Sequence, residues 1–255
     1  MGFTRYKHNN FIQAPLYFLS MNQILTQLRE ELKANTDPQT KAGAKRYFKE
    51  AITLYGVKSS TVAKLSHKNW QQIKNLPKKD LFALCEALFS SGVMEEAFIA
   101  AKWLPKIADQ FQQEDLAIFE RWIDCYIDNW AKCDSFCNHT VGDFMMKFPE
   151  QVGTLMVWAK SSNRWLKRAA AVTLIIPAKK GLFLEEALKI SDLLLIDSDD
   201  LVQKGYGWLL KAETEKHPTE VLAYVMKNKS IMPRTALRYA IEKLPKEQKK
   251  LAMKP

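Results

Sequence analysis

The chain has 255 residues, of which 47% are hydrophobic and 26% are charged, and its formal net charge at pH 7 is +10. These proportions are ordinary for a globular protein, and the longest apolar run, Ala169 to Pro177, is far shorter than the ~20 residues that a membrane helix needs. The excess of positive charge favours an anionic partner such as nucleic acid or a membrane surface, although a passive basic surface is also common.

Cysteine usage indicates a reduced protein. Cys85, Cys125, Cys133 and Cys137 form no Cys-x-x-Cys pair, so free thiols in a cytoplasmic protein are the simplest interpretation. Cys133 and Cys137 are four residues apart and His139 follows them, but a structural zinc site needs a fourth ligand and this spacing is unusual. We therefore expect neither a metal nor another cofactor.

The first part of the chain differs from the rest. Residues 1–20 carry no small-residue cleavage pattern of a secretory signal, and a clean helical pattern begins only at Met21. We expect a mobile N-terminal extension over residues 1–20 and a single domain over residues 21–255. Without a signal, the expected location is the cytoplasm, on the nucleoid when the protein is bound to DNA.

From Met21 onward, apolar residues recur at helical spacing in short segments that are separated by short breaks. Many short helices with short connections favour stacked helical hairpins over a single bundle. The predicted helices, in chain order, are Met21–Ala34, Thr40–Leu54, Lys78–Phe89, Val93–Leu104, Asp115–Trp130, Cys133–Phe148, Glu150–Lys160, Arg164–Ile176, Phe183–Leu193, Leu201–Glu215, Pro218–Met226, Pro233–Leu244 and Glu247–Met253.

A weak internal repeat supports stacked hairpins. Short segments align around Arg168, Lys204 and Arg238, which are 36 and 34 residues apart, and Asp134 lies 34 residues before Arg168. A period of this length is typical of tetratricopeptide, HEAT and armadillo repeats, and the tetratricopeptide consensus is absent. We predict an all-α, HEAT-like helical-repeat solenoid in which equivalent positions line a concave basic face. The alternative is that these cations are ordinary solvated side chains that form no functional face.

Four segments resemble the AlkD-like DNA glycosylases, which are HEAT-like repeat enzymes that excise alkylated purines. Residues 128–134 (DNWAKCD) are similar to the Trp-x-x-x-Asp motif of that family. Residues 163–170 (NRWLKRAA) resemble its Trp-x-x-Arg-Ala segment, and residues 202–208 (VQKGYGW) its lysine-glycine-tryptophan segment. Tyr47, ahead of Gly56, resembles its N-terminal tyrosine region. The matches occur in order from about residue 40 to 240.

The resemblance implies roles for particular residues. Trp130, Asp134 and Trp208 are the expected active-site residues. Arg168 is expected beside the aspartate and the DNA backbone, and Tyr47 is expected to contact DNA near the lesion.

Two further cations, Lys204 and Arg238, are expected to contact the DNA backbone. The segment after Gly56 departs from the family, which usually has a proline and then an arginine there, whereas this chain has Ser59 to Ala63.

Apart from the resemblance, the candidate residues suit the chemistry of glycosidic-bond cleavage. A purine alkylated at N3 or N7 is positively charged, and cleavage of its glycosidic bond develops an oxocarbenium cation on the sugar. A carboxylate such as Asp134 can stabilise that cation and orient the attacking water, and the faces of Trp130 and Trp208 can each add roughly 0.5–2 kcal/mol of cation–π stabilisation. Alternatively, the tryptophans are core residues, Asp134 caps a helix beginning at Ser135, and Arg168 pairs with a nearby acid.

The combined prediction is a monomeric, monofunctional glycosylase that hydrolyses the N-glycosidic bond of N3- or N7-alkylated purines in duplex DNA. The resemblance implies that it acts from the backbone side without flipping the base into a pocket, and that it needs no obligate protein partner. Lys132 could in principle form a Schiff base, but on a continuous helix it would point away from Trp130 and Asp134. The alternatives are a non-catalytic HEAT-repeat DNA-binding protein and a protein-interaction scaffold.

Overall fold

The computed structural model describes residues 14–254, and their regular structure is almost entirely helical. Among these residues, one isolated β-bridge joins Thr53 to Val93. No helix in the described part of the chain is long and apolar enough to cross a membrane. The α-helices are α1 (Ala14–Ala34), α2 (Pro38–Ala44), α3 (Ser59–Ile73), α4 (Lys78–Ser90), α5 (Met94–Trp103), α6 (Asp115–Tyr126), α7 (Trp130–Phe136), α8 (Gly142–Lys147), α9 (Gly153–Trp158), α10 (Arg164–Val172), α11 (Ile175–Lys179), α12 (Leu184–Leu194), α13 (Asp200–Glu213), α14 (Pro218–Asn228), α15 (Arg234–Ala240) and α16 (Lys246–Met253).

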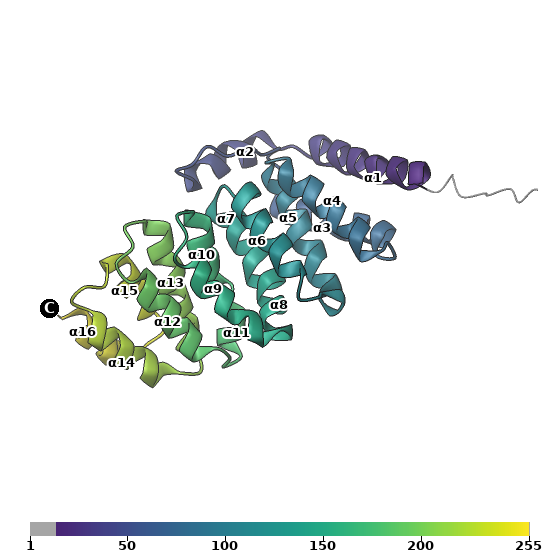
Figure 1. The fold of residues 1–255 in the computed structure, drawn as a ribbon. Coiled ribbons are helices and arrows are strands. Elements are labelled where there is room, and N and C mark those ends of the chain that lie inside the picture. The colour runs from purple at the N-terminus through teal and green to yellow at the C-terminus, as the bar shows by residue number, and fades with distance from the viewer. Residues whose placement is uncertain (1–13, 255) are drawn as a thin grey trace, which may run out of the picture.

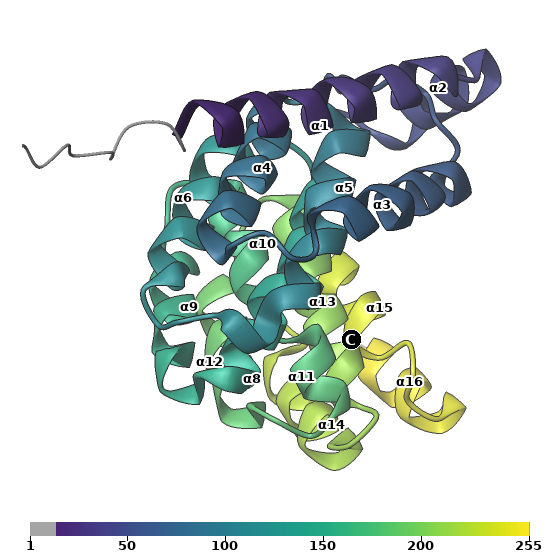
Figure 2. The same cartoon turned by 90° about the vertical axis from the view of Figure 1, so that its right-hand side faces the viewer.

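The helices stack as hairpins in two layers. Helices α5, α7, α10, α13 and α15 pack against one another in chain order and form an inner layer. Helices α4, α6, α9, α12 and α14 form a second, outer layer against them (Figure 1). In Figure 2 the two ends of the stack, α3 and α16, project on the same side, so the molecule is C-shaped. The prediction of an all-α helical-repeat solenoid is confirmed.

Recurring N-caps set the register of the repeat. The side chains of Asn129, Asn163 and Asp199 accept backbone N–H groups in the first turns of α7, α10 and α13, and each such cap contributes about 1 kcal/mol to helix stability. Pro233 occupies the same position before α15. The fifth residue after each cap is a member of the aligned set, which comprises Asp134, Arg168, Lys204 and Arg238.

Gly207 allows α13 and α15 to pack closely. A Cβ atom at this position would lie 2.7 Å from Cβ of Tyr239 and 2.8 Å from the carbonyl oxygen of Ala236. Although alanine is ordinarily about 1 kcal/mol better than glycine inside a helix, here it would force the two helices apart.

We therefore expect Gly207→Ala to lower the free energy of unfolding by about 1–3 kcal/mol, as measured by urea denaturation. The matched control is Gly205→Ala in the same helix, where the nearest atom to the added Cβ is a side-chain carbon 3.5 Å away. Equal stability of the two variants would contradict the close-packing role.

Several predicted boundaries were wrong for local reasons. The first helix begins at Ala14 rather than Met21, and residues 1–13 of the expected extension lie outside the described residues. The helix predicted over Asp115–Trp130 ends at Tyr126, because Asn129 starts a new helix at Trp130. The helix predicted to begin at Cys133 instead belongs to α7, which continues through a π-helical turn into α8.

The largest error concerns the connection between α2 and α3. The helix predicted over Thr40–Leu54 ends in a 3₁₀ turn at Tyr47, and the chain then continues without helix to α3, which was not predicted. The buried carboxylate of Glu95 explains the end of this connection, since it accepts the backbone N–H groups of Tyr55, Gly56 and Val57 at 2.8–3.1 Å. These tertiary hydrogen bonds override the local helix propensity.

Candidate active site

The inner layer has a cavity of about 390 Å³, which we call the tryptophan cavity. Most of the site residues predicted from the sequence line it. Its lining includes Tyr47, Trp130, Asp134, Arg168, Lys204 and Trp208. These side chains come from the α2–α3 connection and from α7, α10 and α13, so they are brought together only by stacking of the repeats.

The spacing within α7 places two of these residues on one side of the helix. Asn129 caps the helix, Trp130 is its first residue and Asp134 follows one turn later. Because residues four apart lie on the same helical face, the indole and the carboxylate both reach the tryptophan cavity. Asp134 is therefore not the N-cap of a following helix.

Arg168 forms a bidentate ion pair with Asp134. Its Nε and one terminal nitrogen donate to the two carboxylate oxygens, each at 2.8 Å. The other terminal nitrogen donates to the carbonyl oxygen of Leu201. Arg168 is only 5% exposed, so its donors are directed at protein acceptors. It lies beside Asp134 as expected, but this arrangement does not present its guanidinium to a DNA phosphate.

The environment of Asp134 combines burial with a fixed countercharge. Burial raises the pKa of the Asp134 carboxyl above its usual value, and the charge and hydrogen bonds of Arg168 oppose that shift. The bidentate contact also fixes the plane of the carboxylate. The pair thus provides a partly desolvated, oriented carboxylate whose ionised form is favoured by its partner.

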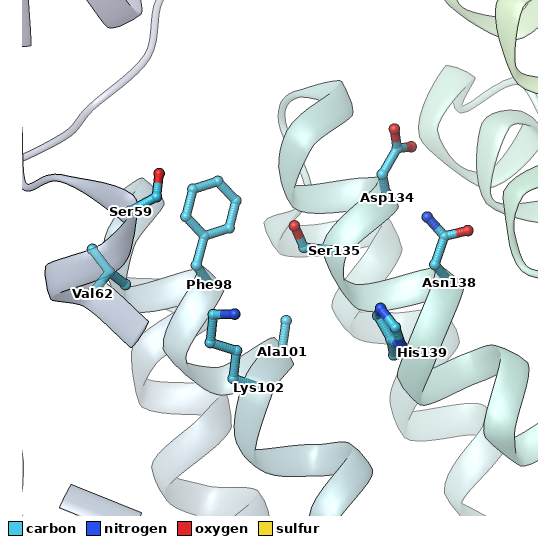
Figure 3. A pocket seen from close by; sticks show the side chains of 9 residues that line it. All are labelled: Ser59, Val62, Phe98, Ala101, Lys102, Asp134, Ser135, Asn138 and His139. Carbon is cyan, nitrogen blue, oxygen red and sulfur yellow. The ribbon is translucent and has the colours of Figure 1, made fainter. Parts of the chain in front are cut away.

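A second cavity of about 430 Å³ lies on another side of Asp134. Figure 3 shows Asp134 and Asn138 on one helical stretch, opposite Phe98 and Lys102 of α5. Asp134 therefore lines both cavities, and other polar side chains contribute to the lining of each.

No group of three or more potential metal ligands occurs within residues 14–254. Cys133 and Cys137 are buried, and Cys133 donates to the carbonyl oxygen of Trp165. These two thiols therefore belong to the core of the inner layer.

Lys132, for which a Schiff-base role was considered and not expected, has a structural role. The side chain of Lys132 is 1% exposed and pairs with Asp128 at 2.9 Å. It also donates to the carbonyl oxygen of Gly92 at 2.7 Å. Its amine therefore links α7 to the turn before α5 by this hydrogen bond.

The rim of the tryptophan cavity is crossed by ion pairs. Asp200 accepts from Lys204 at 3.2 Å and from Lys49 at 3.0 Å. Arg164 pairs with Asp199 at 2.6 Å and with Glu50 at 3.3 Å. Lys204 therefore shares a carboxylate with a second lysine.

The fourth member of the aligned set lies elsewhere. Arg238 is exposed and does not line the tryptophan cavity, whereas its neighbour Tyr239 does. Successive residues of a helix are about 100° apart, so α15 presents the next position to the cavity. Sequence alignment of the repeats could not detect this rotation.

Sequence reasoning also missed an aromatic contact. Phe48 stacks on Trp130, with ring centroids 5.4 Å apart and an interplanar angle of 17°. The adjacent Tyr47 is 77% exposed and lines the tryptophan cavity. The sequence analysis predicted a helix through residue 54 and therefore no contact between Phe48 and α7. In the structure a non-helical connection brings Phe48 to α7.

Comparison with known proteins agrees with the fold. A predicted DNA alkylation repair enzyme from Enterococcus faecalis superposes with a TM-score of 0.75 at 18% sequence identity, covering 83% of this chain and 98% of that one. The alkylpurine DNA glycosylase AlkC from Pseudomonas fluorescens, bound to DNA containing an abasic site analog, gives a TM-score of 0.49 at 18% identity, covering 90% of this chain and 64% of that one. No curated protein matches the sequence. The model of the DNA alkylation repair enzyme family matches residues 28–244, so the chain belongs to that family.

Proposed function

We propose that this family member is an AlkD-like, monofunctional DNA glycosylase for N3- and N7-alkylated purines in duplex DNA. The observation that carries the proposal is the convergence of Trp130, Asp134 and Trp208 on one cavity of the inner layer. Chemistry on the sugar requires a carboxylate and aromatic faces at the same point in space, and the two helices that supply them, α7 and α13, are far apart in the sequence.

The proposed reaction begins with a substrate whose base is already cationic. The C1′–N bond breaks, its electron pair leaves with the purine, and the released base is neutral. The positive charge moves to the sugar as an oxocarbenium ion, which the Asp134 carboxylate and the indole faces stabilise. Water then forms the new C1′–O bond, and Asp134 or solvent takes its proton.

Arg168 has a supporting part in this proposal. Its two hydrogen bonds to Asp134 hold the carboxylate in one orientation and favour its ionised form. We assign phosphate binding instead to exposed cations of the inner layer. The duplex would lie along that layer with the sugar of the lesion next to Asp134, which needs no separate pocket for an extruded base.

The direct test is release of 7-methylguanine and 3-methyladenine from alkylated duplex DNA. Release of both bases, with no release of a neutral lesion base such as uracil, is the expected result, because only a cationic base has a pre-activated bond. Absence of release combined with salt-sensitive duplex binding would favour the non-catalytic DNA-binding alternative. Absence of both would favour a protein-interaction scaffold.

Lys204 and Arg238 provide a test of the DNA-binding face. Each lost phosphate contact should reduce the slope of log K against log salt concentration by about 0.9. We expect Arg238→Ala to show close to this reduction and Lys204→Ala a smaller one, because Asp200 already shares the charge of Lys204. Binding titrations between 50 and 200 mM salt measure both. The control is Lys227→Ala on the outer helix α14; unchanged slopes in both test variants would argue against this face.

A further inference from the structure

Phe48 covers one of the proposed catalytic rings. Its phenyl group lies nearly parallel to the indole of Trp130, at 5.4 Å between centroids and 17° between planes. Trp130 nevertheless lines the tryptophan cavity and is only partly buried. The stack thus restrains a side chain that stands at the first position of α7 and has part of its surface open to the cavity.

The backbone beside Phe48 is attached to the repeats at the rim of the site. Lys49 pairs with Asp200 of α13, and Glu50 pairs with Arg164 of α10. The pair of Lys49 is largely exposed and therefore weak, but the Glu50 carboxylate is only 20% exposed. These contacts join the α2–α3 connection, directly after Phe48, to α10 and α13, the two inner helices that follow α7.

The same connection is also fixed further along. The buried carboxylate of Glu95 accepts three successive backbone N–H groups, from Tyr55 to Val57. A carboxylate with three backbone donors holds a defined backbone conformation. Phe48 therefore directly precedes a segment that is held at its start by Lys49 and Glu50 and at its end by Glu95, and this restrains the backbone beside the Phe48 ring.

We propose that Phe48 is a positioning residue that keeps the Trp130 indole in the orientation required for contact with the sugar cation. The inference rests on the proposed glycosylase function and extends it to a residue that does not line the tryptophan cavity. Cation–π attraction depends on the cation lying over the ring face within about 6 Å of the centroid, so rotation of the indole away from that orientation removes its contribution.

The experiment measures single-turnover excision of 7-methylguanine from duplex DNA with enzyme in excess and at saturation. Phe48→Leu should reduce the rate constant roughly ten-fold, within the range of one cation–π contact. Phe48→Tyr keeps the stacked ring and should stay within about two-fold of wild type. The dissociation constant for the duplex should be unchanged in both variants, because the proposed role acts through the ring of Trp130 and not through a DNA contact of Phe48.

A double-mutant cycle separates positioning from general structural support. In a Trp130→Leu background, Phe48→Leu should cause no further loss, because the ring on which it acts is gone. The matched control is Phe148→Leu, which removes a similarly half-buried ring packed against Phe144 at 4.9 Å between centroids and 48° between planes, away from the site. It should retain the wild-type rate.

The outcomes distinguish the two proposals. A ten-fold loss on Phe48→Leu in both backgrounds would mean that Phe48 does not act through Trp130, and a wild-type rate for Phe48→Leu would overturn the role directly. Failure of Phe48→Tyr to restore the rate would also overturn it. A wild-type protein that excises nothing would overturn the glycosylase function and the positioning role together, whereas an active enzyme insensitive to Phe48 would remove only the latter.

Discussion

Asp134→Asn is expected to lower the single-turnover rate of 7-methylguanine release by roughly 10²–10³-fold, the usual effect of losing one preorganised electrostatic contact to a transition state. Asparagine has nearly the shape of aspartate but lacks the charge that stabilises the oxocarbenium ion. It also cannot accept a proton from the attacking water at neutral pH. The measurement uses excess enzyme and a single labelled lesion, so that neither binding nor product release limits the rate.

The buried ion pair with Arg168 makes a stability control necessary. Asp134→Asn leaves a guanidinium that is 5% exposed without its countercharge, and breaking a buried pair from one side costs about 3–5 kcal/mol of folding free energy. A rate loss could therefore reflect unfolding.

The matched control is the double variant Asp134→Asn with Arg168→Gln, which removes both charges. We expect it to recover most of the lost stability in urea denaturation but none of the lost rate. Excision by the single variant within about three-fold of wild type would remove Asp134 from the mechanism. Recovery of excision in the double variant would show that the carboxylate serves only to neutralise Arg168.

Glu213→Gln is expected to stabilise the protein above neutral pH. Glu213 is fully buried near the end of α13, and neither carboxylate oxygen has a hydrogen-bond partner among the described residues. Loss of hydration raises the pKa of its carboxyl from 4.5 to about 7. Above that pH the folded protein must hold an unpaired buried charge, which costs free energy.

The sign of the pH dependence follows from proton binding. Between pH 4.5 and about 7 the folded protein retains a proton on Glu213 that the unfolded chain releases, so the free energy of unfolding falls as pH rises through this window. The full shift corresponds to roughly 3 kcal/mol. Glutamine carries no charge at any of these pH values, so the variant lacks this loss.

Urea denaturation of wild type and Glu213→Gln at pH 5 and pH 8 tests the prediction. We expect the variant to be more stable than wild type by roughly 2–3 kcal/mol at pH 8 and nearly equal to it at pH 5. Glu215→Gln, two residues away and exposed, is the control and should change neither value appreciably. A difference between wild type and Glu213→Gln that does not vary with pH would contradict the buried-charge explanation.

Local patterns in the sequence were sufficient for the repeat and for the central motif. The spacing of the aligned set predicted the repeat, whereas the caps Asn129, Asn163 and Asp199, which set its register, were identified only in the structure. The four-residue step from Trp130 to Asp134 places both on one helical face. These features depend on hydrogen bonds and side-chain neighbours within about two turns of the chain.

The tertiary structure decided what depends on contacts between distant residues. The connection after Tyr47 has residues that can form a helix, yet Phe48 is extended and stacks on Trp130, and the far end of the connection donates backbone N–H groups to Glu95. Likewise, Arg168 became a buried partner of Asp134 because the two helices pack together. Local preferences of about 1 kcal/mol per residue are outweighed by buried polar contacts that only the stacked repeats provide, so the sequence alone determined the spacing of the site residues and the fold determined their partners.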